Sequence, residues 1–315
     1  MNAKESGSKA IRIGNSIVNI IVLTIVVVLV AFAAYALWDS EQIFQSADKS
    51  HYAVYKPTVE NEGKSFKELQ AINPEVLAWL NVYGTNIDYP VAQGTNNLKY
   101  VNTNVEGDYA LTGAIFLDCA NSKDFSDFNN ILYGHHMQKK AMFGEIGDFS
   151  DKSFFDSHRY GNLYFGGKDH GLEFFAFAHV DAYNISVFAP GVKGTQRQTY
   201  LDNLLTTATH KRDVGVTVED HIIMLSTCSS SSTNGRDILI GRISNKVFED
   251  SFINMKTTDE RVQLTVDSHD SLLKVFIQLL PVFMLALAAL MIVLMLVIIW
   301  RKKRTKDEQE GRTDS

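Results

Sequence analysis

The chain has 315 residues with a formal net charge of −6, and 45% of its residues are hydrophobic. This length suffices for one or two domains. The segments 1–15 and 301–315 each carry a net charge of +2, which leaves −10 on the region between them. Such an acidic region excludes a nucleic-acid-binding protein, which needs a basic surface. The sequence also lacks paired-cysteine and His-Glu-x-x-His spacings, so we expect no metal site and no cofactor.

Two uncharged apolar segments, residues 17–38 and 275–300, lie toward the ends of the chain. Each is long enough for a helix that crosses a bilayer, which needs about 20 residues. Basic residues precede the first segment, and four of them follow the second at 301–304. The positive-inside rule then predicts that both termini are cytoplasmic and that the middle of the chain lies outside the cell membrane. The alternative for the first segment is a signal peptide, cleaved near Ala34-Tyr35-Ala36.

These segments predict a series of parts along the chain. They are a cytoplasmic tail (1–16), a transmembrane helix (17–38), an extracellular stalk (39–64), a folded domain (65–255), an extracellular linker (256–274), a second transmembrane helix (275–300) and a cytoplasmic tail (301–315). The folded domain is therefore expected outside the cell, anchored in the membrane by a helix before it and a helix after it.

The folded domain begins with helical patterns and continues as β-structure. Residues 65–72 predict a short amphipathic helix with Ser65 as its cap, and Pro74 begins a second short helix that extends to Trp79. Residues 82–92 are typical of a strand, a tight turn and a second strand. Many short strands separated by turns predict a mainly β fold, either a closed barrel or a sandwich. The other predicted elements are strands at 114–117, 130–133, 163–165, 172–180, 222–228 and 236–243, and a helix at 195–209.

Cys228 ends the apolar strand 222–228, and Arg236 opens the next strand after a loop of small and polar residues. If the chain simply turns back, the thiol and the guanidinium lie close together at one rim of a sheet. A neighbouring cation favours the reactive thiolate, and an arginine donates hydrogen bonds to an oxyanion with a permanent charge. Arg242 is the alternative arginine, but about 20 Å of strand separates it from Arg236. Two other interpretations remain open: a buried structural cysteine, or a disulfide with Cys119, the other cysteine.

A cysteine nucleophile needs a base or an imidazolium partner, and the chain has nine histidines. His135 is the best candidate, because the apolar strand 130–133 and Gly134 place its imidazole at a strand rim. His136 cannot point into the same site if the backbone is extended, since successive side chains alternate. The alternative for His135 is a hydrogen-bonded surface residue.

Several motifs, taken in order, resemble those of class B sortases. The similarity covers residues 65–243, and although each motif alone has little specificity, the ordered set is strongly specific. The motifs are Tyr133-Gly134-His135-His136-Met137 followed by Met142-Phe143-Gly144; Leu225-Ser226-Thr227-Cys228 with Arg236 ahead of an aliphatic strand; Ile72-Asn73-Pro74-Glu75-Val76 leading to Gly84-Thr85-Asn86-Ile87-Asp88-Tyr89-Pro90-Val91; and Gly113-Ala114-Ile115-Phe116-Leu117-Asp118.

This resemblance implies an eight-stranded sortase β-barrel with short helices, flanked by the two transmembrane helices, in which residues 65–255 are the catalytic domain. The implied reaction is transpeptidation. A cysteine cleaves a C-terminal sorting signal of an exported protein, and an amine of peptidoglycan or of a pilin lysine resolves the thioester. The implied site consists of Cys228, His135 and Arg236 as catalytic residues, with Ser226, Thr227 and Tyr133 as candidate substrate-binding residues.

Three features depart from the class B pattern. His136 stands where class B members often have Asn, Met224 stands where Thr usually opens the cysteine motif, and a C-terminal span is more familiar from the class C pilin polymerases. The Asp-Pro-aromatic lid usual in class C is missing, because none of the five prolines follows an aspartate. Two alternative functions remain open: another Cys-His cell-wall peptidase, and a non-catalytic binding module tethered to the membrane.

Overall fold

The computed structural model describes residues 3–58, 63–229 and 233–253. The chain divides into two units. One includes the N-terminal residues up to Gln42, and the other begins at Ile43. The second unit contains all of the described strands and is the part that carries the site discussed below.

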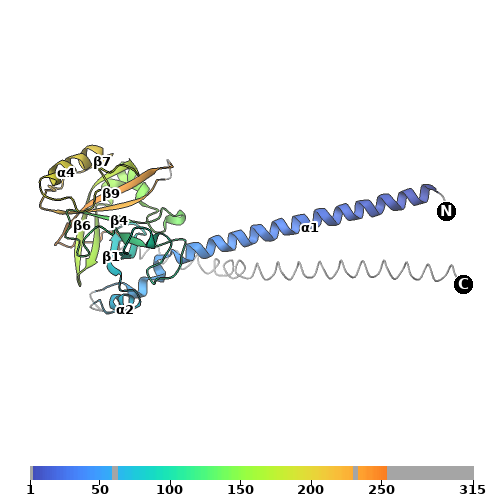
Figure 1. The fold of residues 1–315 in the computed structure, drawn as a ribbon, viewed down its shortest axis with the longest axis horizontal. Coiled ribbons are helices and arrows are strands. Elements are labelled where there is room, and N and C mark those ends of the chain that lie inside the picture. Colours follow the sequence, from blue (N-terminus) through green and yellow to red (C-terminus); the bar gives the residue numbers. More distant parts are fainter. Residues whose placement is uncertain (1–2, 59–62, 230–232, 254–315) are drawn as a thin grey trace. The chain divides into compact units, whose positions relative to one another are not determined.

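Helix α1 (Ala3–Ser46), blue in Figure 1, holds the first predicted membrane span. Over Gly14–Gln45 it is apolar and long enough to cross a bilayer, and it is the one helix of that kind among the described residues. The predicted linker 256–274, the second span 275–300 and the tail 301–315 lie outside the described residues.

The second unit is built on a closed β-barrel. Neighbouring strands pair in the order β5-β1-β2-β3-β4-β8-β9-β6, and β6 pairs back with β5, so eight strands close into a ring. The two-residue β7 is added to the side of β6. The prediction of an eight-stranded barrel is confirmed. In the described residues the strands are β1 (Val76–Val82), β2 (Asp88–Ala92), β3 (Ile115–Leu117), β4 (Asn129–Tyr133), β5 (Tyr160–Phe165), β6 (Lys168–Asp181), β7 (His210–Lys211), β8 (His221–Cys228) and β9 (Gly235–Ser244).

The barrel wall is buried on both faces along β8. Ile223 and Leu225 belong to the main core, whereas Ile222 and Met224 belong to a second cluster on the opposite face. Successive side chains of a strand point to opposite faces, so burial of both faces requires a continuous apolar run rather than alternation. This requirement explains why residues 222–225 are all apolar.

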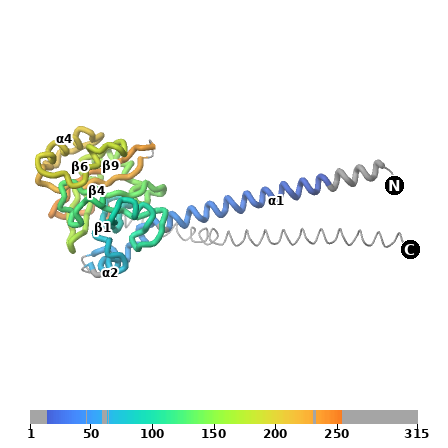
Figure 2. Tube along the Cα trace, viewed as in Figure 1, coloured from blue at the N-terminus to red at the C-terminus, as the bar shows by residue number. Residues whose placement is uncertain are grey.

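Helix α4 (Gln196–Thr207) contacts β6 and packs on the second cluster, which also holds Ile238 and Ile240 of β9 (Figure 1 and Figure 2). Its Tyr200, Leu201 and Leu204 are buried there. The Tyr200 hydroxyl donates to the Val187 carbonyl at 2.6 Å, and it accepts from the Asn129 amide at 2.6 Å. The helix predicted at 195–209 is thus present, and it ties the segment before it to the start of β4.

Two local predictions for the start of the domain are wrong. Residues from Val76 onward form β1 rather than a helix, because this stretch pairs with β2 on one side and β5 on the other. Helix α2 (Lys64–Ile72) begins after Gly63 without a side-chain cap. The Ser65 hydroxyl instead donates to the Lys56 carbonyl at 3.2 Å, which joins the helix to the segment before it.

The residues that follow α1 pack into the barrel unit. Ala47 and Tyr52 are buried in the main core. The Tyr89 hydroxyl donates to the Ala47 carbonyl at 2.8 Å, and the Lys56 ammonium pairs with the Asp88 carboxylate. Two 3-10 turns, η1 (Lys49–His51) and η2 (Ala53–Tyr55), shape this segment.

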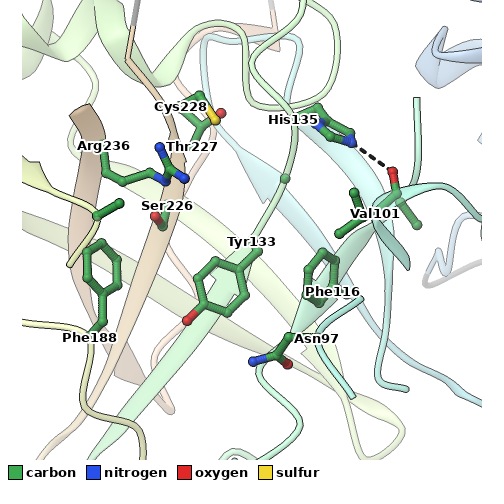
Figure 3. A pocket seen from close by; sticks show the side chains of 13 residues that line it. Asn97, Val101, Phe116, Tyr133, His135, Phe188, Ser226, Thr227, Cys228 and Arg236 are labelled. Carbon is green, nitrogen blue, oxygen red and sulfur yellow. Dashed lines mark hydrogen bonds between the residues drawn. The ribbon is translucent and has the colours of Figure 1, made fainter. Parts of the chain in front are cut away.

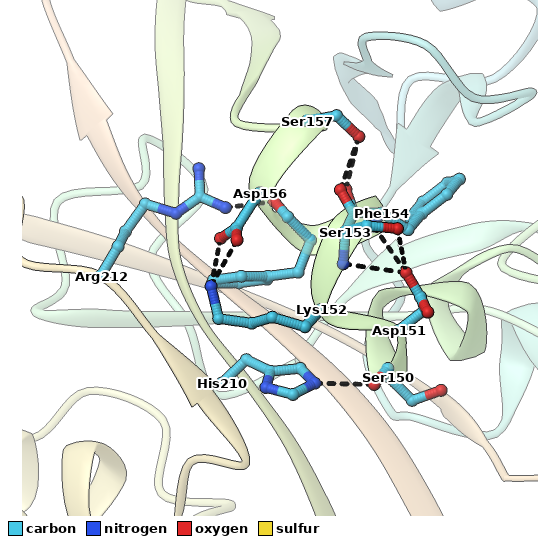
Figure 4. Close-up of polar contacts among 10 residues, drawn as sticks. Ser150, Asp151, Lys152, Ser153, Phe154, Asp156, Ser157, His210 and Arg212 are labelled. Carbon is cyan, nitrogen blue, oxygen red and sulfur yellow. Dashed lines mark hydrogen bonds and ion pairs between the residues drawn. The ribbon is translucent and has the colours of Figure 1, made fainter.

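Helix α3 (Lys152–Ser157) is fixed by its cap, and the turn just before it is bonded to β7, the strand that follows α4 (Figure 4). One Asp151 carboxylate oxygen accepts from the backbone amides of Ser153 and Phe154, both at 2.9 Å, which satisfies groups that a helix start leaves without partners. On β7, His210 donates from Nε2 to the Ser150 carbonyl at 2.7 Å. Three further 3-10 turns, η3 (Lys99–Val101), η4 (Gln138–Lys140) and η5 (Ile146–Ser150), complete the described helices.

Candidate active site

Two parallel strands end side by side at one rim of the barrel. Strand β4 pairs with β8 in parallel, and Tyr133 is in register with Ser226. The Gly134 amide continues the ladder by donating to the Ser226 carbonyl at 3.2 Å. As a result, His135 follows the end of β4 at the level where Cys228 ends β8.

The third predicted residue reaches the same rim through an antiparallel pair. Strands β8 and β9 pair along their length, and Cys228 stands directly opposite Arg236. Beyond them, the Ser229 amide donates to the Gly235 carbonyl at 2.9 Å. The sequence-based expectation that the chain turns back and brings the thiol and the guanidinium together is met.

Cys228, His135 and Arg236 line one cavity of about 460 Å³ (Figure 3). The three predicted substrate-binding residues, Tyr133, Ser226 and Thr227, line it as well. Four more lining residues come from loops outside the predicted motifs: Asn97, Val101, Ala182 and Phe188. No pattern in the sequence marks these loop residues, since each is placed by packing between segments far apart in the chain.

A backbone carbonyl orients the imidazole of His135. Its Nε2 lies 2.8 Å from the Val101 carbonyl oxygen, as the dashed line in Figure 3 marks. A carbonyl only accepts, so Nε2 carries the hydrogen and the neutral ring keeps Nδ1 as its acceptor. The neighbouring His136 forms an isolated bridge with Met142 and is not among the cavity-lining residues within the described ranges.

Both cysteines are free and exposed. The alternative of a disulfide between Cys119 and Cys228 is therefore wrong, and so is the alternative of a buried structural thiol at 228. An exposed thiol at the edge of a cavity is open to a substrate, as a nucleophile must be.

Arg236 keeps its charge available. Its Nη1 donates to the Gly235 carbonyl at 3.0 Å, and no carboxylate in residues 3–58, 63–229 and 233–253 pairs with it. Arg242, at the far end of β9, is engaged instead. It donates to the Glu173 carboxylate at 2.7 Å, and Arg159 donates to the other oxygen of that carboxylate at 2.8 Å.

Tyr133 and Asn97 are held by one buried carboxylate. The Tyr133 hydroxyl donates to Asp118 at 3.0 Å, and the Asn97 amide donates to the same oxygen at 2.9 Å. Burial, together with the Asp118 charge, raises the pKa of Tyr133. The tyrosine therefore stays protonated at physiological pH and forms part of the cavity wall rather than acting as a base.

Ser226 and Thr227 carry buried hydroxyls with no hydrogen-bond partner among the described residues. Strand alternation puts Ser226 on the same face as Cys228 and turns Thr227 to the opposite face. A buried hydroxyl without a partner costs about 1–3 kcal/mol. The Ser226 hydroxyl thus offers an unused hydrogen-bonding group beside the thiol. In the described part of the chain no group of three His, Cys, Asp or Glu residues is placed to hold a metal ion.

This barrel is the fold of the sortases, which are cysteine transpeptidases. No family model matches the chain. Among curated proteins, sortase B of Staphylococcus aureus is 30% identical over 208 residues, which cover 64% of this chain and 81% of the relative. The chain belongs to the class B sortases.

Two solved structures are similar in both sequence and fold. Sortase B from the type II pilus of Streptococcus pneumoniae is 48% identical, with a TM-score of 0.51, and the match covers 57% of this chain and 99% of that structure. A Streptococcus pyogenes class B sortase involved in pilus biogenesis is 38% identical, with a TM-score of 0.54, covering 58% and 100%. Because the matched regions cover nearly all of both solved chains, the likeness extends well beyond the motifs at the rim.

Replacing Arg242 with alanine is expected to lower stability and leave turnover unchanged. The change removes a charge-assisted hydrogen bond to Glu173, whose side chain is only 7% exposed. Such bonds contribute about 1.5–3 kcal/mol, and Arg159 remains to pair the carboxylate. The free energy of unfolding, measured with urea, should decrease by an amount within that range. A loss of kcat/KM without a loss of stability would instead make Arg242 part of the site.

Proposed function

We propose that Cys228 is the nucleophile of a transpeptidation reaction on exported proteins that carry a C-terminal sorting signal. The observation that supports it is the register of three strands, which puts the thiol opposite Arg236 and beside the end of the His135 strand, all on one cavity. The thiolate attacks a backbone carbonyl of the signal, the peptide C–N bond breaks, and a thioester remains on Cys228.

His135 carries the protons in this scheme. Its Nδ1 takes the proton of the Cys228 thiol and gives it to the leaving amine as the thioester forms. It later takes a proton from the incoming amine and returns it to the Cys228 sulfur as the C–S bond of the thioester breaks. Arg236 donates to the carbonyl oxygen while negative charge builds on it. A guanidinium without a carboxylate partner among the described residues suits this role, because its positive charge is not already neutralised and only Nη1 is bonded, to the Gly235 carbonyl.

The cavity wall provides the substrate-binding groups. Ser226 has an unused hydroxyl on the face of the thiol, and Tyr133 supplies a ring that Asp118 holds in place. Thr227 contributes through its backbone, since alternation turns its side chain away. The mostly apolar lining, with Phe188 and Ala182 on one side, fits an extended peptide better than a charged small molecule.

We assign the amine acceptor to a pilin lysine rather than to peptidoglycan. Two solved relatives at 48% and 38% identity are described as belonging to a pilus or as acting in pilus biogenesis. The curated Staphylococcus aureus relative is more distant, at 30%.

The membrane arrangement remains the one predicted from charge. We propose that residues 17–38 and 275–300 span the membrane, that the tails 1–16 and 301–315 are cytoplasmic, and that the chain between the two spans lies outside. Within the predicted stalk (39–64), Ala47 and Tyr52 belong to the core of the barrel unit rather than to a separate stalk. The apolar length of α1 supports the first span. A reporter that works only outside the cell, fused after residue 315, should be inactive. Activity of that fusion would contradict this arrangement.

A competition between two amines tests the acceptor. The full-length protein in detergent is incubated with an exported protein that bears a sorting signal, a pilin subunit and a peptidoglycan cross-bridge peptide in equal amounts. We expect mass spectrometry to find the new isopeptide bond on a pilin lysine. Products on the cross-bridge peptide alone would refute the pilin assignment, and absence of any thioester on Cys228 would refute the reaction itself.

Replacing Arg236 with alanine is expected to reduce kcat/KM about a hundred- to a thousand-fold, because one oxyanion donor typically contributes about 2.7–4 kcal/mol. Lysine at this position should recover only part of the loss, since a mobile ammonium lacks the fixed geometry of a guanidinium. Steady-state kinetics with a fluorogenic sorting peptide measures both variants. Full rescue by lysine would indicate that only the charge matters.

A further inference from the structure

The hydrogen bond that orients His135 depends on a backbone group from a distant loop. The Val101 carbonyl lies at the end of η3, and its oxygen accepts from His135 Nε2 at 2.8 Å. The contact is made by the main chain of residue 101. The packing of the backbone around this residue therefore sets the position of the carbonyl.

Gly113 provides that packing. A Cβ atom at this position would lie 2.4 Å from the Tyr100 carbonyl oxygen and 2.6 Å from the Val101 carbonyl oxygen. Both distances are far shorter than any contact that a real side chain makes. Gly113 also has a φ of +57°, which side chains rarely adopt. The neighbouring Ala114 amide donates to the Tyr100 carbonyl at 2.9 Å, which holds the two segments at this close approach.

We propose that Gly113 is a positioning residue for the active site. By having no side chain, it lets the 100–101 backbone approach closely enough for the Val101 carbonyl to hold the His135 imidazole in one orientation and one tautomer. This inference rests on the proposed role of His135 in proton transfer. It adds that the orienting group of the histidine is a main-chain carbonyl, and that a glycine from a third segment determines where this carbonyl lies.

The consequence for chemistry is specific. While the Val101 carbonyl accepts a hydrogen bond from Nε2, the nitrogen that is left to exchange a proton is Nδ1. A shift of the carbonyl frees the ring to turn and to populate the other tautomer. A misplacement of about 1 Å in a catalytic group can cost about a hundred-fold in rate.

The chain offers a matched control. Gly107 lies in the same connection between η3 and β3, also has a positive φ, +98°, and has no atom within 4 Å of the place where a Cβ would be. Gly107→Ala therefore introduces backbone strain without moving the Val101 carbonyl. The experiment compares Gly113→Ala, Gly107→Ala and His135→Ala in the full-length protein, with kcat/KM measured well below each variant's thermal midpoint.

We expect Gly113→Ala to lose about a hundred-fold in kcat/KM and to show an altered pH–rate profile, while Gly107→Ala stays close to the parent. If His135→Ala is inactive but Gly113→Ala behaves as Gly107→Ala does, the positioning role is wrong and the proposed function stands. If His135→Ala keeps full turnover, the proposed function itself fails.

A spectrum of the parent protein tests the proposal even if Gly113→Ala does not fold. With nitrogen-15-labelled histidine, the neutral His135 ring should show its hydrogen on Nε2 and a bare Nδ1. In a folded Gly113→Ala protein this signature should be lost, whereas Gly107→Ala should keep it. A parent spectrum with the hydrogen on Nδ1 would overturn the inference.

Discussion

Replacing Cys228 with alanine is expected to abolish thioester formation and turnover completely. Alanine removes the only group at this position that can form the covalent intermediate. The fold should persist, because residue 228 is exposed at the end of β8 and its removal leaves no cavity in the core. Mass spectrometry of the protein after incubation with a sorting peptide measures the acyl-enzyme directly.

Cys119→Ser is the matched control for that experiment. Cys119 is the other free, exposed thiol and does not line the cavity in the described residues. This variant should retain both the acyl-enzyme and the rate of the parent. Turnover by Cys228→Ala, or its loss in Cys119→Ser, would contradict the assignment of the nucleophile.

Replacing His135 with alanine is the second change with a very large expected effect. General acid–base catalysis alone is worth about 10²–10⁴-fold, and the loss of the imidazole beside the thiolate adds to it. We expect kcat/KM to fall by at least that range, with the thermal midpoint little changed, because His135 is only partly buried, at a cavity edge. Stopped-flow or quenched-flow kinetics of acylation measures the loss at the chemical step.

His136→Asn is the control for the histidine pair. His136 stands outside the cavity lining, and its buried Nδ1 has no partner among the described residues. An amide there should change turnover only slightly, and this substitution also restores the residue more usual in class B. A larger loss in His136→Asn than in His135→Ala would reverse the assignment.

The sequence was sufficient for the strands around the site because their physical signals are local. Residues 222–225 are apolar on both faces, as a strand buried on both sides requires, and the loop of small and polar residues before Arg236 favours a reversal of the chain. Register then follows from the reversal, and it places Arg236 opposite Cys228. The motif around His135 was found in the same way, at the end of a short apolar strand.

The errors arose where tertiary pairing outweighed local preference. Val76, Ala78 and Trp79 lie after Pro74 in a stretch that a helix also tolerates, and the partners on both sides make it β1. The Ser65 cap was wrong because the serine hydroxyl bonds a carbonyl of the preceding segment instead. Helix α3, which was not predicted, does carry a local signal, because Asp151 is a favourable cap residue directly before it.

The orienting contact of His135 was beyond reach of any sequence pattern. Every residue type has a main-chain carbonyl, so the valine at position 101 does not indicate that its carbonyl orients His135. Gly113 carries the only trace of it, and a single glycine in a loop is equally typical of an ordinary turn. The loop residues Asn97, Ala182 and Phe188 were missed for the same reason, since the barrel brings them together from distant segments.

The closed ring of strands also limits how the enzyme can take up a peptide. Many proteins bind an extended ligand by adding it as a further strand to an open sheet edge. Around the cavity this route is blocked in the described residues: β8 is paired on both sides, by β4 and β9, and β4 is paired by β3 and β8. Along the paired parts of these strands, main-chain pairing, which a peptide of any sequence offers equally, is therefore closed to a substrate. For the peptide substrate proposed above, selection therefore rests on side chains near the thiol, and the paired strands offer other extended chains no edge to add to.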